Sequence, residues 1–322
     1  MSYQMIFKLA SQVTVLADNL DAKHVVLLAG GMSSERYVSS ESGKAVGRAL
    51  LENGYNVTLI DPGADLGSIL SDLKPDVVYN CLHGTYGEDG CVPGLLNMMH
   101  IPYTHSGLMA SSIAFNKLAT RKFFANDANV HFIKACVVNK HALPKIEPIP
   151  RPFIIKPLSE GSSVGVELIM PEDEFSFASY AFTYGQNMLV EEYIKGREIQ
   201  VAVLNGKALG ALELKMLKNR FYDYQTKYTD GYAEHLMPAP LDEAANQYLL
   251  EVSEHIYRSL GCNGMARAEF IYDEHNKIFY FLEINTHPGM VGLSICPEIA
   301  AFAGINFNDM IEMILASAKY ET

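Results

Sequence analysis

Several features that mark particular protein classes are missing from this chain of 322 residues. It has no tryptophan, and its 25 lysines and arginines are outnumbered by 37 aspartates and glutamates, which gives a net charge of −12. That charge argues against nucleic acid or an anionic membrane as the main partner. No apolar run has the length of a membrane span, and the first residues lack the basic leader and unbroken apolar run of a signal peptide. We expect a cytoplasmic protein.

Cysteine is too scarce to form a disulfide framework. The five cysteines are an odd number, are widely spaced and include no Cys-x-x-Cys pair: Cys81, Cys91, Cys136, Cys262 and Cys296. We expect free, mostly buried thiols in a reducing compartment. The chain also lacks a Walker-type Gly-x4-Gly-Lys-Ser/Thr motif, since Ser42-Gly43-Lys44 is followed by alanine.

Strand and helix patterns alternate in the first third of the chain. The predicted strands are 24–31, 56–60 and 76–83, and the helices between them are 40–53 and 66–73. This alternation predicts an α/β fold with a parallel sheet of βαβ units. Functional groups are then expected at the carboxyl ends of the strands, where Gly30-Gly31 and His83-Gly84 lie. We take 24–105 as the first domain and 1–23 as an N-terminal extension of unknown role.

The remainder reads as two further regions, 106–191 and 192–322. In the first, a helix at 117–125 precedes strands at 151–156 and 165–169, which a Gly/Ser loop joins. In the second, strands at 197–204 and 208–215 flank Asn205-Gly206, a strong hairpin signal. Residues 217–240 are polar, tyrosine-rich and aperiodic, which is typical of a functional or disordered loop.

An acidic hairpin is the most informative local pattern. The apolar runs 266–272 and 277–285 flank a polar turn, and Glu283 and Asn285 point to one side of a strand. If Glu269 pairs opposite Phe281, then Arg267, Glu269, Glu283 and Asn285 share one face. Oxygen ligands of this kind favour Mg²⁺ or Mn²⁺ over zinc. The alternative is a solvated edge hairpin with scattered charges.

Three other loops could carry chemistry. The loop 160–165 offers amides and hydroxyls that can wrap phosphate oxygens, with Lys156 before it, although a plain turn is the simpler reading. The loop from His83 to Gly90 suits a substrate better than zinc, because no third ligand is near His83 and Glu88. The tyrosines of 221–228 suit a lid that excludes water, or a surface loop packed on its own rings.

Six motifs together resemble the D-alanine–D-alanine ligases, ATP-grasp carboxylate–amine ligases, in order and spacing over residues 24–318. They are Gly30-Gly-Met-Ser-Ser-Glu-Arg36 with Val38-Ser39, His83-Gly-Thr-Tyr-Gly-Glu-Asp-Gly90, Lys156-Pro-Leu-Ser-Glu-Gly-Ser-Ser-Val-Gly165, Phe221-Tyr-Asp-Tyr-Gln-Thr-Lys-Tyr228, Arg267-Ala-Glu269 and Glu283-Ile-Asn-Thr-His-Pro-Gly-Met290. The resemblance implies that a two-subdomain ATP-grasp fold follows the first domain, with the loop 217–240 as lid. It also implies ATP-driven ligation of two D-alanines through an acyl phosphate, giving ADP, phosphate and a dipeptide for peptidoglycan precursors.

The resemblance also implies a role for each ATP and metal residue. Lys117 and Lys156 would hold the ATP phosphates beneath Ser162 and Ser163. Adenine would be contacted by Glu191, Glu192 and Ile194, and the ribose by Glu198. Two Mg²⁺ ions, with Mn²⁺ as a possible substitute, would be bound by Glu269, Glu283 and Asn285.

The substrate residues follow in the same way. Glu35 would anchor the ammonium of the first D-alanine beside Val38 and His83, while Arg267 and the amide of Gly289 would stabilise the oxyanion. The second D-alanine would be held by Lys227, Ser294 and Ile295. A hydrogen-bonded trio of Glu35, Ser162 and Tyr228 would close the lid.

The chain departs from the family pattern at a few positions, and other activities stay open. Glu269 stands where aspartate is more frequent, and Pro93, Asn116, Ser159 and Val291 also differ. The rivals are a ligase that accepts D-lactate or D-serine, an ATP-grasp ligase for another acid and amine, and a non-catalytic nucleotide-binding regulator. The family suggests a homodimer.

Overall fold

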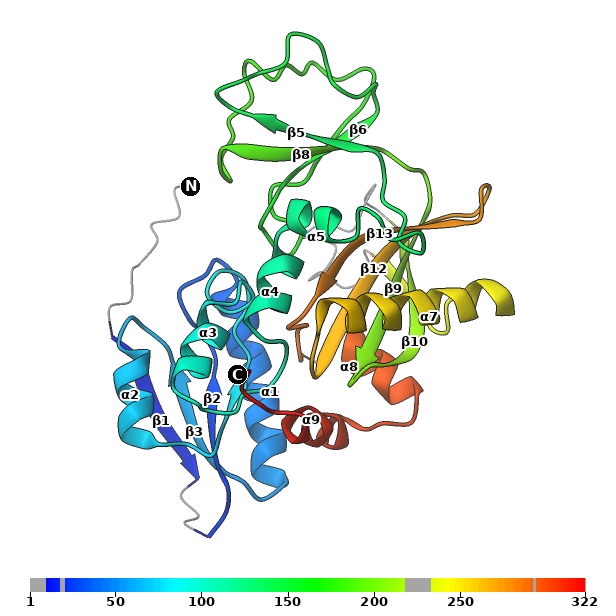
Figure 1. Ribbon diagram of the computed structural model, residues 1–322. Coiled ribbons are helices and arrows are strands. Elements are labelled where there is room, and N and C mark those ends of the chain that lie inside the picture. Colours follow the sequence, from blue (N-terminus) through cyan, green and yellow to red (C-terminus); the bar gives the residue numbers. More distant parts are fainter. Residues whose placement is uncertain (1–9, 18–20, 218–232, 292–293, 322) are drawn as a thin grey trace.

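The computed structural model describes residues 10–17, 21–217, 233–291 and 294–321. Its strands form three sheets, each in its own lobe, and the helices lie against the first and the third (Figure 1). The fold class predicted from the sequence, α/β with several sheets, agrees with this arrangement.

The first sheet has the parallel βαβ core that the alternating pattern predicts. Its strand order is β1-β3-β2-β4, and β2 is parallel to both β3 and β4. The elements are β2 (His24–Leu28), α1 (Arg36–Glu52), β3 (Asn56–Asp61), α2 (Leu66–Leu73) and β4 (Val77–Asn80). Helix α1 begins four residues before the predicted start, so Glu35 occupies its N-cap position.

Strand β1 (Gln12–Ala17) is an element that the sequence reading missed. It pairs antiparallel with β3 and adds an edge to the first sheet. Its Val13, Val15 and Leu16 are exposed, so pairing with β3, and not the burial of one face, makes this segment a strand. Part of the segment before His24 is therefore built into the sheet.

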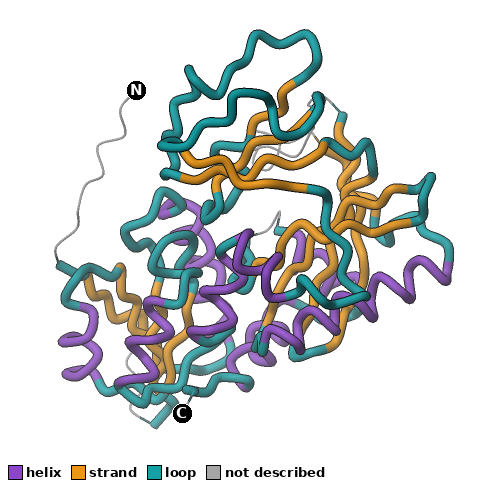
Figure 2. Tube along the Cα trace, turned by 45° about the horizontal axis from the view of Figure 1, so that its top comes forward, coloured by secondary structure: helices purple, strands orange, loops and turns teal. Residues whose placement is uncertain are grey.

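The second sheet is antiparallel and forms a lobe of strands and loops, upper in Figure 2. Its order is β5-β8-β6-β7, with β5 (Ala135–Asn139), β6 (Phe153–Pro157), β7 (Glu167–Ile169) and β8 (Asn187–Glu192). Phe153, Ile155 and Val190 are fully buried and form its core. The predicted Gly/Ser loop joins β6 to β7 as expected.

The third sheet is antiparallel and covered on both faces. Its order is β11-β10-β9-β12-β13, with β9 (Arg197–Leu204), β10 (Lys207–Met216), β11 (Ala233–Leu236), β12 (Met265–Asp273) and β13 (Ile278–Asn285). Val201 and Val203 pack with α7 (Glu243–Leu260), whereas Ala202 and Leu204 pack with α8 (Ile295–Phe302). The prediction of an aperiodic loop over 217–240 is wrong for 233–236, which pair with β10; residues 218–232 lie outside the described residues.

The first and third lobes share one hydrophobic core. Val46 and Leu50 of α1 belong to the same buried cluster as Met310 and Ile314 of α9 (Phe307–Ala316). The other helices are α3 (Cys91–Met98), α4 (Leu108–Phe115) and α5 (Lys117–Phe123). This shared core fixes the strand ends of the first sheet against the third sheet.

Among the described residues no single helix is long and apolar enough to cross a membrane. Only α8 and α9 taken together reach that length and composition, and they meet at a bend of 105°. Their apolar side chains Ile295, Ile299 and Met310 lie in the shared core.

Candidate functional site

A cavity of about 420 Å³ lies where the three lobes meet. Its walls come from α1, the loop after β4, the loop between β6 and β7, the strands β12 and β13, and the loop between β13 and α8. Many of the predicted site residues line it: Glu35, Val38, His83, Lys117, Ser162, Arg267, Glu283, Asn285, Gly289, Ser294 and Ile295. Segments up to 260 residues apart in the sequence thus form one site.

The acidic hairpin forms one wall of the cavity, with a register that differs from the prediction. Glu269 lies opposite Glu283 and Arg267 opposite Asn285. Phe281 pairs with Phe270, so the expectation that it faces Glu269 is wrong. The pairing on the turn side is offset by one residue from the predicted register, and a β-bulge between Glu269 and Phe270 adds a second residue of offset. The four polar side chains still share one face, because no bulge interrupts the pairing of residues 267–269 with residues 283–285.

Cationic side chains neutralise both carboxylates of the hairpin. Arg267 Nε lies 3.1 Å from a Glu269 oxygen, and Lys117 Nζ lies 2.9 Å from a Glu283 oxygen. Burial is the largest influence on Lys117 and lowers its pKa, but Glu283 and the neighbouring carboxylates outweigh it, so the pKa is raised. Lys117 also donates to the carbonyl of Glu160 at 3.0 Å, which ties the helix α5 to the β6–β7 loop.

The donor chemistry of this wall fits a hard divalent cation. Two carboxylates and an amide are oxygen donors of the kind that Mg²⁺ and Mn²⁺ prefer. The Asn285 side-chain oxygen accepts the amide of His287 at 2.7 Å, which fixes its direction. Among the described residues, no three His, Cys, Asp or Glu side chains are grouped as a metal site would need, so the zinc alternative with His83 has no third ligand.

Of the predicted nucleotide residues, Lys156, Glu191 and Glu192 lie on the second sheet and are not among the residues that line the cavity. Lys156 on β6 and Arg121 on α5 both pair with the buried carboxylate of Glu191 on β8. Burial raises the pKa of Glu191, but the two cations outweigh it and the pKa is lowered. Lys156, expected to meet phosphate, is therefore engaged by Glu191, and Arg121 is a partner that the sequence reading missed.

The remaining predicted nucleotide residues lie at the end of β8, on β9 and in the loop between β6 and β7. Glu192 ends β8 and Ile194 follows in the connection to β9. Glu198 on β9 accepts from the Gln200 amide at 3.1 Å. Ser163 stands beside Ser162 in the β6–β7 loop, and both have left-handed backbone angles, φ 57° and φ 50°.

The β6–β7 loop reaches across the cavity to the N-cap of α1. The Ser162 hydroxyl donates to the Glu35 carboxylate. Gly161 allows this approach, because a Cβ there would lie 2.8 Å from a Glu35 oxygen. Two members of the predicted trio thus meet; Tyr228, its third member, and Lys227 lie outside the described residues.

His83 lies behind Glu35 and is bound to a buried carboxylate. Its Nδ1 is 3.1 Å from Glu88, and both side chains are buried. Burial is the largest influence and lowers the pKa of His83, but the hydrogen bond to Glu88 and the charges of Glu88 and Glu35 outweigh it, so the pKa is raised. Burial raises the pKa of Glu88.

The loop after β13 brings Gly289 and Ser294 into the cavity lining beside α1. The Ser294 hydroxyl accepts the amide of Val291 at 3.1 Å, and a Cβ on Gly289 would lie 3.1 Å from that hydroxyl. Ile295 begins α8 and is buried. The close packing fixes the backbone of this loop beside Arg267.

Other lining residues were not singled out from the sequence. Glu160 lines the cavity, and burial raises its pKa. Tyr37 and Glu41 line its mouth. They lie four residues apart on α1, and this spacing on the same helix as Glu35 and Val38 is a signal that could have found them.

Comparisons with known proteins agree on one family. A family model described as the D-ala D-ala ligase C-terminus matches residues 132–316, and one for the N-terminus matches residues 64–106. D-alanine–D-alanine ligases of Rickettsia felis and Rickettsia bellii are 57% and 56% identical over 320 residues, 99% of each chain. This length includes most of the first 23 residues, so the expectation that the likeness begins at residue 24 is too narrow.

Solved structures give the same result. The D-alanine–D-alanine ligase of Bacillus anthracis superposes with a TM-score of 0.80 at 29% identity, covering 92% of this chain and 97% of that one. The same enzyme complexed with ATP gives a TM-score of 0.79 at 26% identity over the same shares.

Proposed function

This chain belongs to the D-alanine–D-alanine ligase family, and we propose that its cavity joins two D-alanine molecules at the expense of ATP. The reaction passes through an acyl phosphate and releases ADP and phosphate. The observation that carries the proposal is the meeting, in one cavity, of the Glu35–Ser162 contact with Arg267, Gly289 and Ser294. These groups suit two small zwitterions held side by side.

The first D-alanine is proposed to bind at the α1 wall. Glu35 is a carboxylate at the N-cap, placed to accept an ammonium group, and His83 behind it is fixed by Glu88. Val38 on the same helix would contact the methyl group. Arg267 and the Gly289 amide face the same space and would stabilise negative charge on the carboxyl oxygen in the transition state.

The phosphate side of the reaction is proposed to use Lys117 and the acidic hairpin. Glu269, Glu283 and Asn285 would hold Mg²⁺ or Mn²⁺, two ions by the family pattern. Such ions would supply positive charge that stabilises the charge developing in phosphoryl transfer. Lys117, which pairs with Glu283 and lines the cavity, would hold a phosphate oxygen.

The ATP base and ribose are proposed to lie against the second and third sheets. Glu191, Glu192 and Ile194 would border adenine and Glu198 the ribose, with Lys156, Ser162 and Ser163 toward the phosphates. The buried group of Lys156, Glu191 and Arg121 supports this by fixing Lys156 beside the β6–β7 loop.

The second D-alanine is proposed to bind beside Ser294 and Ile295, with Lys227 and Tyr228 assigned by the family pattern. Holding the amine next to the activated carboxyl can supply on the order of 7–11 kcal/mol of the barrier. Positioning therefore outweighs acid–base chemistry in this reaction.

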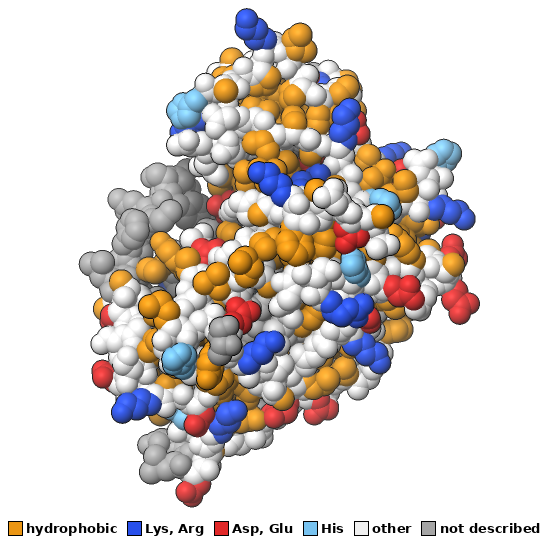
Figure 3. Space-filling model, in the orientation of Figure 1, with side chains coloured by type: hydrophobic (Ala, Val, Ile, Leu, Met, Phe, Trp, Pro, Cys, Tyr) orange, Lys and Arg blue, Asp and Glu red, His pale blue; other side chains and the backbone are white. Residues whose placement is uncertain are grey.

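The cellular setting is also proposed. The dipeptide would serve peptidoglycan precursor synthesis in the cytoplasm, and a homodimer is expected from the family. The five free cysteines support a reducing compartment. On the face shown in Figure 3, basic and acidic side chains are interspersed and do not form one basic patch.

The test is phosphate release from ATP and Mg²⁺ with D-alanine, with L-alanine, and with D-alanine plus D-lactate, with products identified by mass. Release that depends on D-alanine, with D-alanyl-D-alanine formed, is the expected result. A product formed only with D-lactate would show that the assignment of the second substrate's site is wrong. No release with any acid would refute the proposal.

A further inference from the structure

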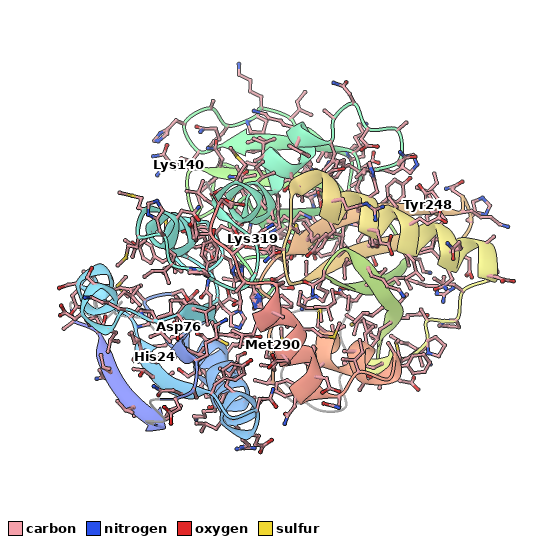
Figure 4. The ribbon with its side chains drawn as sticks, turned by 60° about the horizontal axis from the view of Figure 1, so that its bottom comes forward. His24, Asp76, Lys140, Tyr248, Met290 and Lys319 are labelled. Atoms are coloured by element: carbon pink, nitrogen blue, oxygen red, sulfur yellow. The ribbon has the colours of Figure 1, made fainter. Side chains whose placement is uncertain are left out.

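Ser42 is a buried residue of α1 with two tertiary hydrogen bonds. Its side chain is fully buried, and its hydroxyl accepts the amide of Met290 at 3.1 Å. The same hydroxyl lies 3.3 Å from His83 Nε2. Met290 lies near the middle of the molecule in Figure 4, between the blue N-terminal elements and the salmon C-terminal helices.

Ser42 shares with Ser39 of the same helix a hydroxyl that bonds outside its own helix, and it differs in this from several other helical serines. Ser40, Ser71 and Ser253 each donate the hydroxyl to the carbonyl four residues before them, which is the usual local bond. Ser42 instead joins two segments that lie 41 and 248 residues away in the sequence. Its hydroxyl therefore serves the packing of the site and not its own helix.

Hydrogen-bond donors and acceptors match along the series Glu88, His83, Ser42 and Met290. With Glu88 ionised, His83 Nδ1 donates to it, and the neutral ring then presents Nε2 as an acceptor. The Ser42 hydroxyl can then donate to Nε2 while it accepts the Met290 amide. When His83 is protonated, Nε2 donates to the same oxygen, whose second lone pair is available.

The series ends at the loop that carries Gly289. Two consecutive amides of this loop are held by serine hydroxyls from opposite sides, Met290 by Ser42 of α1 and Val291 by Ser294 at the start of α8. Gly289 immediately precedes them, so the direction of its amide depends on both anchors.

We propose that Ser42 is a positioning residue for the ligase reaction: its hydroxyl holds the Gly289–Met290 backbone in register with His83, so that the Gly289 amide faces the carboxyl group bound near Glu35. This inference rests on the proposed function, in which the Gly289 amide stabilises the oxyanion. Removing the hydroxyl lets the loop shift, and a shift of about 1 Å can cost about a hundredfold in rate.

The test compares Ser42→Ala with Ser253→Ala, which removes an equally buried helical hydroxyl far from the cavity. For Ser42→Ala we expect kcat to fall about 10- to 100-fold, with the KM for ATP and the affinity for ADP unchanged. The affinity for a phosphinate mimic of the tetrahedral adduct should fall by the same factor as kcat/KM, because both report transition-state contacts. Ser253→Ala should keep the activity of the unaltered enzyme.

Three results would overturn the inference. They are a Ser42→Ala enzyme within twofold of normal kcat, a loss of kcat without loss of affinity for the mimic, and an equal loss of activity in Ser253→Ala. If Ser42→Ala does not fold, Ser42→Cys keeps the volume with a weaker hydrogen bond, and normal kcat in that variant would also overturn it. Failure of the unaltered enzyme to release phosphate with D-alanine would instead refute the proposed function.

Discussion

His105 should make this protein sensitive to mild acid, and the effect can be predicted from its surroundings. Its ring is buried, its Nδ1 has no hydrogen-bond partner among the described residues, and the ring of His287 lies 5.0 Å away. Burial, with a smaller contribution from the charge of His83, lowers the pKa of His105 to about 3. The native protein therefore keeps this ring neutral across the range in which free histidine becomes charged.

The sign of the effect follows from proton linkage. An unfolded histidine takes up a proton near pH 6.5, whereas folded His105 does so only near pH 3. Between these values the unfolded state binds one more proton, so the free energy of unfolding falls as the pH is lowered. The slope is about 1.4 kcal/mol per pH unit, which removes about 2 kcal/mol between pH 6.5 and pH 5.

The perturbation is His105→Asn. The backbone of His105 has φ 70°, a left-handed conformation that asparagine adopts more readily than most residues. The variant loses ring contacts, and that cost is the same at every pH. The titration is lost as well, so the stability of the variant should fall less steeply below pH 6.5.

The assay is urea unfolding at several values from pH 7.5 to pH 5, with the free energy extrapolated to water. The difference between the unaltered protein and the variant should change by about 2 kcal/mol over this range. His141→Asn, which removes an exposed histidine, is the control for a histidine-to-asparagine change as such. Parallel curves for the unaltered protein and His105→Asn would refute the reasoning.

Three further variants test other parts of the site. Glu283→Gln should raise the Mg²⁺ concentration needed for phosphate release by about tenfold or more, because a charged oxygen ligand is lost; an unchanged Mg²⁺ titration would contradict the metal assignment. Glu191→Gln should lower the free energy of unfolding by about 3–5 kcal/mol in denaturant titrations, because it leaves the charges of Lys156 and Arg121 without their buried carboxylate; a loss below 1 kcal/mol would speak against this pairing. Glu88→Gln should lower the pKa of His83, so the pH dependence of the KM for D-alanine should move to lower pH, and an unmoved profile would rule out that coupling.

Local sequence patterns determined much of the fold before any contact was known. The strand at 197–204 and the helix at 66–73 have the predicted bounds, because their apolar periodicity is regular and turn residues flank them. Strand β1 and strand β11 escaped detection. Both are short edge strands, and what makes them strands is the neighbour with which they pair.

For the candidate site, too, some features could be predicted from the sequence and others could not. The motifs identified the family and most of the residues that line the cavity, since the chemistry of a ligand site constrains residue type at fixed spacing. The exact register of the acidic hairpin could not be read, because the turn offsets the pairing by one residue and a bulge after Glu269 offsets it by another, which makes Glu283 its partner. That bulge depends on pairing across the sheet and leaves no mark in the apolar pattern.

By itself, the sequence determined the types of side chain that this protein brings to its site and the order in which they come. Only the tertiary structure decided which of them meet. Glu191 takes both Lys156 and Arg121, and Ser42 joins His83 to Met290. These contacts link residues 35 to 248 positions apart, and they arise because strand pairing and the packing of the lobes bring distant segments together, which no local pattern of the chain can encode.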